Sequence, residues 1–346
     1  MPGRVGFDGL IGETPLVRVA SLSEETGCEV LAKCEFLNPG GSSKDRVALS
    51  IVEEAEREGR LGPGGTVVEG TSGSTGISLA QVCRARGYRC VIIMPDDQAI
   101  EKRELLSRLG AEVELVRPAS IVNQGHYVNV ARERAAEIPG AIFANQFENM
   151  ANFKMHYETT GPEIWRDAGE RLDAFVMSAG TGGTIAGVSM YLKAQNPDVR
   201  VVLADCQGSS LFHRVNDGVL YTREQAERRL RRHRDDTLCE GIGIDRLTAN
   251  FETGLPAIDE ALRVSDQEVV DMSRHLLAHD GLFVGSSSAL NLCAARETAR
   301  RLGPGHTVVT VICGSGSREL TKLYNDAYLA SRGLVSPSSI NSPLVQ

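Results

Sequence analysis

The chain has 346 residues, of which 24% are charged and 42% hydrophobic, and its formal net charge is -8. This balance is typical of a globular protein with room for two domains, and the acidity argues against a nucleic-acid surface. No apolar run approaches the length of a membrane span, and no charged leader precedes an apolar segment. We therefore expect a cytoplasmic protein that acts on small molecules and needs neither nucleic acid nor membrane.

The eight cysteines contain no C-x-x-C pair and mostly lie inside apolar runs. Such a distribution favours buried, reduced thiols over a zinc site or a disulfide framework. We expect no metal ion. The cysteines are Cys28, Cys34, Cys83, Cys90, Cys206, Cys239, Cys293 and Cys313.

The first predicted elements are an extended Pro15-Leu16-Val17 step and a strand at 29–35, followed by the stretch 38–46. This stretch reads Asn-Pro-Gly-Gly-Ser-Ser-Lys-Asp-Arg, and apolar residues at helical spacing follow it up to Gly59. Ser42 and Asp45 match the S-x-x-D pattern of a helix cap, so Lys44 lies in the first helical turn. A cation there opposes the helix dipole, which suits an amine meant to lose its charge better than a structural residue. The alternative is a solvated surface lysine.

Short apolar strands and amphipathic helices alternate along the rest of the chain, which predicts an α/β protein with parallel sheets. A first set has strands near 66–69, 90–94, 112–116 and 141–144 and helices near 75–86, 98–109 and 123–137. A second set has a long helix over 153–168, strands near 173–178 and 199–204, and helices near 183–195, 266–279 and 287–302. A last strand at 307–312 leads to a terminal helix. Ser265 with Glu268 forms a capping box, and Gly281 ends that helix.

Two segments interrupt this alternation. Residues 223–236 are rich in arginine and predict a short charged surface helix. A nucleic-acid patch is disfavoured there because acidic residues are interleaved and Tyr221 is the one aromatic nearby. The tail at 333–346, rich in Ser and Pro, is expected to be disordered or loosely packed.

Three predicted strands run into turns made almost wholly of Gly, Ser and Thr, at 70–76, 178–184 and 313–317. In an open parallel sheet such turns gather at the carboxyl edge, where helix N-termini and free N–H groups attract phosphate or carboxylate. A nicotinamide site fits poorly. The stretch with Gly180 and Gly182 lacks the third glycine of the G-x-G-x-x-G pattern. The strand near 199–204 does end in Asp205, an acidic residue of the kind that this pattern requires.

Over about residues 8–330 the chain resembles the cysteine synthase and cystathionine β-synthase group of pyridoxal-phosphate enzymes, the β-family or fold type II. The resemblance implies two domains, each a mainly parallel sheet flanked by helices, with pyridoxal 5'-phosphate in the cleft between them. Residues 1–40 and 151–332 would form the larger domain, and 41–150 a smaller mobile domain with the substrate-carboxylate loop. It also implies a homodimer. The matching stretches are 12–16, the Lys44 turn, 69–76, 145–149, 156–165, 180–184 and 240–243.

The resemblance also assigns roles to single residues. Lys44 would form the Schiff base with the cofactor and move the proton at the substrate Cα. The cofactor phosphate would be held by Gly180, Thr181, Gly182, Gly183 and Thr184, and the pyridine nitrogen by Ser315. The substrate carboxylate would be bound by Thr71, Ser72, Gly73, Thr75 and Gln146, with Gly241 lining the amino-acid site.

The residue types agree with this chemistry. Lys44 must lose a proton near neutral pH to exchange an imine, which burial promotes. A serine at the pyridine nitrogen does not keep the ring protonated, so the cofactor is a weaker electron sink. This favours loss of a β-substituent, through an aminoacrylate, over transamination.

Ser74 is the one departure from the family pattern, because the T-S-G-N-T-G loop usually has Asn at this place. Ser74 would still be a cofactor-binding residue, but the shorter serine cannot span the same gap to the ring hydroxyl. Either a water fills the gap or the substrate preference differs. The alternative is that Ser74 merely caps the following helix. The chain also shows no second regulatory region and no Cys-His pair near its start suggestive of a haem segment, which favours a cysteine synthase-like enzyme.

We therefore expect β-replacement on an O-activated L-serine, such as O-acetylserine or O-phosphoserine, with sulfide, to give L-cysteine. The alternatives are a cysteine desulfhydrase that releases sulfide, pyruvate and ammonia, a cystathionine-forming enzyme, and an enzyme using an unusual nucleophile. All use the same cofactor and Lys44, so the sequence barely separates them. A catalytically silent binding partner is disfavoured because Lys44, Ser315 and the glycine loop are intact.

Overall fold

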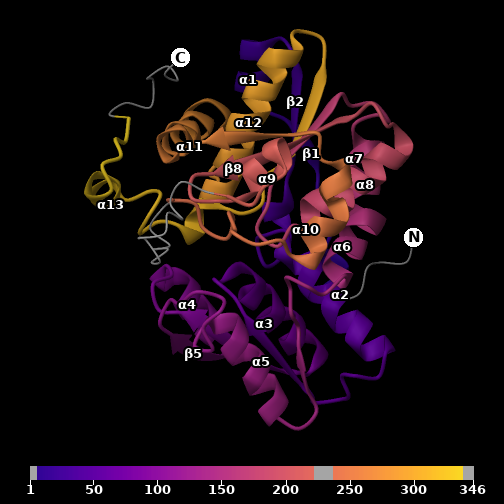
Figure 1. The fold of residues 1–346 in the computed structure, drawn as a ribbon, viewed down its shortest axis with the longest axis vertical. Helices are drawn as coiled ribbons and strands as arrows, with labels where there is room; N and C mark the ends of the chain where they lie inside the picture. Colours follow the sequence, from indigo (N-terminus) through magenta and orange to yellow (C-terminus); the bar gives the residue numbers. More distant parts are fainter. Residues whose placement is uncertain (1–5, 222–236, 338–346) are drawn as a thin grey trace.

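The strands form two separate sheets, each flanked by helices, in a computed structural model that describes residues 6–221 and 237–337 (Figure 1). The six-stranded sheet has the order β1-β2-β10-β7-β8-β9, and the four-stranded sheet the order β5-β4-β3-β6. All described neighbours are parallel except β1 and β2, so the predicted α/β class with mainly parallel sheets is confirmed. The strands are β1 (Leu16–Arg18), β2 (Glu29–Lys33), β3 (Thr66–Gly70), β4 (Arg89–Pro95), β5 (Glu112–Val116), β6 (Ala141–Phe143), β7 (Ala174–Ser178), β8 (Arg200–Cys206), β9 (Glu260–Val264) and β10 (Thr307–Val311).

Helices cover both faces of the six-stranded sheet, which explains why its central strands are apolar throughout. In β7, Ala174 and Val176 pack into one core with α11 and α12, whereas Phe175 and Met177 pack into the opposite core with α8. The helices of this part are α1 (Ala20–Thr26), α6 (Ala151–Met155), α7 (Gly161–Asp167), α8 (Gly183–Gln195), α9 (Leu211–Asp217), α10 (Ala249–Gly254), α11 (Asp266–Asp280), α12 (Ser286–Leu302) and α13 (Asp326–Ser331).

The four-stranded sheet is built in the same way and lies below the larger sheet in the view of Figure 1. In β3, Val67 packs with α2 and α3, and Val68 packs with α5 on the other face. The helices of this part are α2 (Lys44–Arg57), α3 (Ser74–Arg86), α4 (Ile100–Arg108) and α5 (Tyr127–Glu137). The assignment of the two sheets to a larger domain and a mobile smaller domain stays a prediction.

The predicted helix over 153–168 is present, but to describe it as regular α-helix throughout would be wrong. The structure has α6, a π-helical turn at His156–Thr160, and α7. Pro162 lies in the first turn of α7 and has no N–H to continue the α-helical ladder, so a discontinuity before it is expected. The chain stays helical through this turn, which begins with His156.

The predicted S-x-x-D cap of α2 is also wrong. The helix begins at Lys44, and no side chain caps it in the expected way. Ser42 Oγ accepts a hydrogen bond from the Lys44 N–H at 3.3 Å, but Asp45 turns elsewhere, accepting from Gly40 N at 2.6 Å and from Ser78 Oγ at 2.5 Å. Asp45 thus ties the turn before Lys44 to α3. The capping box of Ser265 and Glu268 is present as predicted, and Gly281 ends α11 with φ +67°.

Several elements were not predicted, namely α1, α9, α10 and the edge strand β9. The predicted charged helix at 223–236 lies outside the described residues, as does the tail from 338 onward. Val335 exchanges hydrogen bonds with the Gln267 side chain at 2.8 and 2.9 Å, so the start of the tail contacts α11. Within the described ranges, every helix is too short or too polar to cross a bilayer.

Candidate active site

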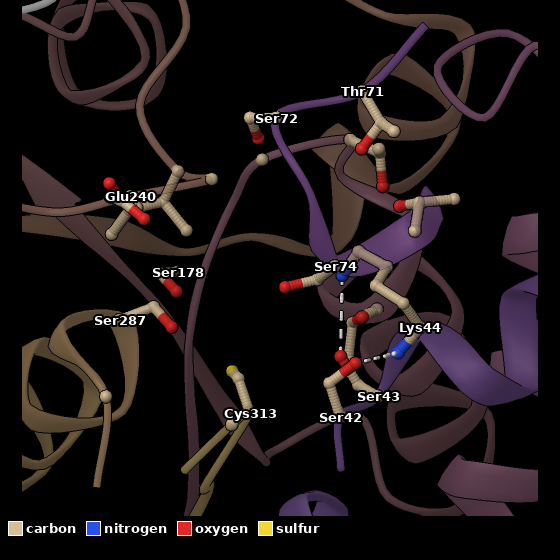
Figure 2. Close-up of a pocket in the computed structure, with 18 of the residues that line it drawn as sticks. Ser42, Ser43, Lys44, Thr71, Ser72, Ser74, Ser178, Glu240, Ser287 and Cys313 are labelled. Carbon is tan, nitrogen blue, oxygen red and sulfur yellow. Dashed lines mark hydrogen bonds between the residues drawn. The ribbon is translucent and has the colours of Figure 1, made fainter. Parts of the chain in front are cut away.

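Lys44 is the first residue of α2, and its side chain enters a pocket between the two sheets (Figure 2). Its ammonium donates to Ser43 Oγ at 3.4 Å, a long hydrogen bond that holds the chain only weakly. Burial lowers the pKa of Lys44, whereas the nearby Cys313, Glu35 and Asp45 act to raise it. The lysine is therefore more easily deprotonated than one in water, as the sequence predicted for a reactive amine.

The turn after β3 forms one wall of the pocket and leads into α3. Thr71 Oγ1 accepts from Gly73 N at 3.1 Å, and Thr75 Oγ1 donates to Gln146 Oε1 at 2.5 Å. Gln146 Nε2 in turn donates to Gly70 O at 3.2 Å and to Glu69 Oε1 at 3.3 Å. These bonds fix the hydroxyls at a helix N-terminus, which suits a carboxylate ligand.

Glu69 lies directly below this turn and is fully buried. Burial raises its pKa to about 8, although hydrogen bonds from Gln146 favour the charged form. A neutral carboxyl group here adds little negative charge beneath a turn that would bind an anion.

The turn after β7 forms a second wall and opens α8. Gly182 has φ +86°, and a Cβ at this position would lie 2.7 Å from the backbone N of Phe251, so only glycine fits. Asn152 Nδ2 donates to Thr181 Oγ1 at 2.9 Å. The Thr184 hydroxyl lies 3.0 Å from Nε2 of buried His156, whose pKa burial lowers well below its usual value. A neutral His156 ring, which lies in the π-helical turn before α7, thus holds the Thr184 hydroxyl in place.

The turn after β10 closes the third side. Gly314 forms an isolated bridge with Ser42, which joins this turn directly to the turn that carries Lys44. Ser315 Oγ accepts from Ser317 N at 3.2 Å and lies 3.1 Å from Ser317 Oγ. Because Ser315 Oγ accepts both of these hydrogen bonds, its O–H remains for an acceptor.

The structure brings most of the predicted site residues into one pocket. Gly73 and Gly183 are the two that do not line it: Gly73 is backed by the Lys102 side chain, and Gly183 by Asn152. The predicted residues that do line it are Lys44, Thr71, Ser72, Ser74, Thr75, Gln146, Gly180, Thr181, Gly182, Thr184, Gly241 and Ser315. Ser74 is the first helical residue of α3 rather than its cap, since the N-cap is Gly73 without a side-chain bond.

The sequence did not predict the charged residues at the pocket mouth. Glu240 forms ion pairs with Lys102 of α4 and, at 2.6 Å, with Lys322 of the C-terminal segment. Burial would raise the pKa of Glu240, but the two ammonium groups lower it, so the carboxylate is charged. Nearby, Glu101 accepts from the Thr321 N–H at 3.0 Å and from its hydroxyl at 2.9 Å. These contacts link the two sheets across the pocket.

Cys313 corrects the expectation that all eight cysteines are buried. All eight are free, but Cys313 is half-buried and lines the pocket opposite Lys44 (Figure 2). Burial raises its pKa, and the nearby Lys44 ammonium lowers it by less. Ser178 and Ser287 lie on the same side of the cavity. Ser178 and Cys313 begin two of the predicted glycine-rich turns, but none of these three residues was predicted to have a role in the site.

The pocket residues fit pyridoxal phosphate. The fit requires a reactive lysine, an anion site for the phosphate and a polar group for the ring nitrogen. Lys44 is the candidate lysine, the glycine turn at the N-terminus of α8 is the candidate phosphate site, and Ser315 is the candidate partner of the ring nitrogen. All three line the same cavity. The described residues hold no cluster of His, Cys, Asp and Glu suited to a metal ion.

Comparison with known proteins agrees with this geometry. Residues 7–314 match the family model described as "Pyridoxal-phosphate dependent enzyme". The chain is 52% identical to cysteine synthase 2 of Schizosaccharomyces pombe over 97% of its length and 88% of the relative. It is 54% identical to cysteine synthase 2 of Neurospora crassa, covering 92% of this chain and 73% of that protein. A putative mitochondrial cysteine synthase of Saccharomyces cerevisiae is 50% identical over 93% of this chain and 84% of its own.

Among solved structures, that of O-ureido-L-serine synthase superposes with a TM-score of 0.79 at 34% identity and covers 94% of this chain and 98% of its own. A mutant of the same enzyme with bound O-ureido-L-serine gives a TM-score of 0.80, also at 34% identity, over 95% of this chain and 98% of that one. The match in sequence, fold and pocket shows that the chain belongs to the family of pyridoxal-phosphate dependent enzymes.

Proposed function

We propose that this chain catalyses β-replacement on an O-activated L-serine, O-acetylserine or O-phosphoserine, with sulfide as the nucleophile and L-cysteine as the product. The observation that carries the proposal is Lys44, a lysine of lowered pKa at a helix start, in a pocket with three anion-binding turns. Relatives named cysteine synthase, about half identical over nearly the whole chain, support this product.

Lys44 has two roles in this proposal. It binds the cofactor in the resting enzyme, and it removes and returns the proton at the substrate Cα once the substrate occupies the site. Both roles need a neutral amine, and burial favours this form by lowering the pKa of Lys44. The long bond to Ser43 Oγ leaves the amine free to exchange partners.

The two glycine-rich turns divide the anionic groups between them. We assign the cofactor phosphate to residues 180–184, with Thr184 held by His156. We assign the substrate carboxylate to Thr71, Ser72, Gly73 and Thr75 together with Gln146, with Gly241 beside the substrate. When bound, pyridoxal phosphate supplies an electron-accepting ring that stabilises the charge developing at Cα and so allows the β-substituent to leave.

Ser315 and Ser74 would adjust this chemistry. A neutral hydroxyl at the ring nitrogen, Ser315, does not hold a proton there as a carboxylate would, which favours rapid loss of the β-substituent. Ser74 lines the pocket at the N-terminus of α3 without capping the helix. Its hydroxyl would leave more room beside the cofactor and substrate than the asparagine usual in this loop.

A panel of amino-acid substrates and nucleophiles with mass detection tests the function. We expect cysteine from O-acetylserine or O-phosphoserine with sulfide, at a rate well above that with serine, homocysteine or other nucleophiles. Faster release of pyruvate from cysteine would instead indicate a desulfhydrase, and cystathionine would indicate the transsulfuration reaction. Loss of all products in Lys44→Ala ties the activity to this pocket.

The same proposal includes a homodimer in the cytoplasm and a smaller domain, residues 41–150, that moves against the rest. A molar mass of twice that of the chain in light scattering tests the dimer. Because the Saccharomyces relative is named mitochondrial, microscopy of the tagged chain beside a mitochondrial marker tests the compartment.

A further inference from the structure

Glu69 is a fully buried carboxyl group that is bonded by amides rather than by a cation. It is the next-to-last residue of β3 and directly precedes the turn at 70–76. Its two oxygens accept from the Gln146 N–H and from Gln146 Nε2, each at 3.3 Å. A carboxylate buried without a countercharge is costly, so burial favours the neutral form and raises the pKa of Glu69 to about 8.

Gln146 connects Glu69 to the turn assigned to the substrate carboxylate. Its Nε2 shares two hydrogens between Glu69 Oε1 and Gly70 O, and its Oε1 accepts from Thr75 Oγ1 at 2.5 Å. Because Gly70 O can only accept, the amide is held with its oxygen toward Thr75. Gln146 and Thr75 both line the pocket that Lys44 enters. The end of β3, the amide and the first turn of α3 therefore form one connected unit.

Loss of the Glu69 proton would change this unit in two ways. It would place a negative charge beneath the substrate turn, in surroundings where water screens little. It would also make the two bonds from Gln146 charge-assisted, and so hold the amide more firmly toward β3. Both changes oppose the binding of a carboxylate in the pocket.

The other ionisable groups around Glu69 among the described residues are neutral or have partners of their own. The thiol of Cys90 on β4 lies close by, and Cys83 of α3 and burial raise its pKa well above the usual value, so it stays neutral. Val67 packs toward α2 and α3 and Val68 toward α5, so Glu69 points with Val67. The charged residues of α3 are in its last turn. Those at the start of α2, after β6 and on α6 bond elsewhere, namely Lys44 to Ser43, Asp45 to Gly40 and Ser78, Arg46 to Glu35 and Glu163, Glu148 to Arg246, and Lys154 to Glu54.

We propose that Glu69 is a positioning residue for the substrate carboxylate and that the enzyme binds the amino acid in the form in which Glu69 holds its proton. The inference rests on the proposed use of the turn at 70–76 for that carboxylate. Glu69 acts through Gln146 and Thr75 and does not touch the substrate itself. By linkage, bound substrate in turn keeps Glu69 protonated.

The experiment measures the Kd of L-alanine, an amino acid without a leaving group, for the loaded enzyme by calorimetry at two pH values. With a pKa of about 8, only about one-tenth of Glu69 keeps its proton at about pH 9, against about nine-tenths at about pH 7. Glu69→Gln has no proton to lose at this place, whereas the ligand amine and Lys44 titrate in both proteins. Between these pH values the wild-type Kd should therefore rise about threefold to tenfold more than that of Glu69→Gln.

Asp205→Asn is the matched control. Asp205 is also a buried carboxyl group near the end of a strand, β8, and burial raises its pKa to about 6. It accepts from the Phe212 N–H at 2.7 Å and does not line the pocket. Its replacement should keep the wild-type ratio of the two Kd values. In turnover of O-acetylserine with sulfide, the difference between wild type and Glu69→Gln should appear in KM and not in kcat, because saturating substrate keeps Glu69 protonated.

Three outcomes would overturn the inference. One is a wild-type Kd that does not rise between about pH 7 and about pH 9, a result that needs no variant to fold. Another is an equal ratio of Kd values in wild type and Glu69→Gln, and the third is a difference that appears in kcat rather than in KM. A wild-type chain that does not bind pyridoxal phosphate would refute the proposed function itself, so the two failures are distinguishable.

Discussion

Arg46 connects the helix that carries Lys44 to the larger sheet, and its replacement gives a quantitative test of the structure. Its guanidinium donates to both oxygens of Glu35, each at 2.8 Å, and to those of Glu163 at 2.6 and 2.7 Å. Lys33 binds Glu163 from the other side at 2.9 Å. Arg46, Glu35 and Glu163 are all at least 95% buried, so water screens none of these charges.

Replacement of Arg46 by methionine keeps most of the side-chain volume but leaves Glu35 buried without a countercharge. Loss of one partner from a buried ion pair typically costs about 3–5 kcal/mol. At about 2 °C per kcal/mol in a chain of this size, the melting temperature should fall by about 6–10 °C. Arg46→Lys keeps the charge but not the forked geometry, so its loss should be intermediate.

The loss should depend on pH. Burial by itself would raise the pKa of Glu35, but Arg46 brings it below its usual value. In the wild type this carboxylate therefore stabilises the fold above about pH 4.5, and the contribution is lost as the pH falls below that. In Arg46→Met the carboxyl group should instead be protonated readily. The deficit relative to wild type should accordingly be larger at about pH 8 than at about pH 5.

Arg166 is the control for this measurement. It also binds two carboxylates, Glu13 at 2.9 Å and Asp167 at 2.8 Å, but its side chain is 56% exposed. Arg166→Met should cost no more than about 1 kcal/mol. Thermal unfolding of the loaded enzymes, followed by circular dichroism, compares the two variants. Equal losses in both, or no pH dependence in Arg46→Met, would refute the reasoning.

Three further changes test single parts of the site. Lys44→Ala should lower turnover by more than about a hundredfold and abolish visible absorbance, with the circular dichroism spectrum unchanged. Burial raises the pKa of Glu69 in the folded protein to about 8, from about 4.5 in the unfolded chain. The unfolded chain therefore loses this proton first, and the wild type loses stability as the pH rises from about 4.5 to about 8. Glu69→Gln should therefore have a higher melting temperature than the wild type at about pH 9 and a similar one at about pH 5. Ser74→Asn should change the kcat/KM ratios among O-acetylserine, O-phosphoserine, serine and cysteine by about two- to tenfold, and unchanged ratios would contradict a role in selectivity.

The strands and the three glycine-rich turns could be predicted from the sequence because their requirements are local. A strand buried on both faces needs a continuous apolar run, as in β7, and a turn such as that at Gly182 needs a residue that accepts a positive φ. Lys44 could be placed at the start of α2 because Pro39 and the glycines before it break regular structure. The edge strand β9 escaped prediction because it is only partly covered and includes Glu260 and Arg263, so it shows no clear apolar run.

The capping prediction at Ser42 and Asp45 failed for a tertiary reason. The pattern is correct for an isolated helix start, but Asp45 finds better partners in Gly40 N and in Ser78 Oγ of α3. The helix predicted over 153–168 is present, but its π-helical turn before Pro162 was not predicted, because periodicity does not distinguish a regular α-helix from one that contains such a turn.

The sequence by itself thus determined the fold class, the position of Lys44 at a helix start and the turns around it, since each depends on a few neighbouring residues. Only the tertiary structure decided which charges meet at the pocket mouth. Lys102 and Glu240 are 138 positions apart, and although Glu240 begins the stretch 240–243, no local feature of the sequence pairs it with Lys102.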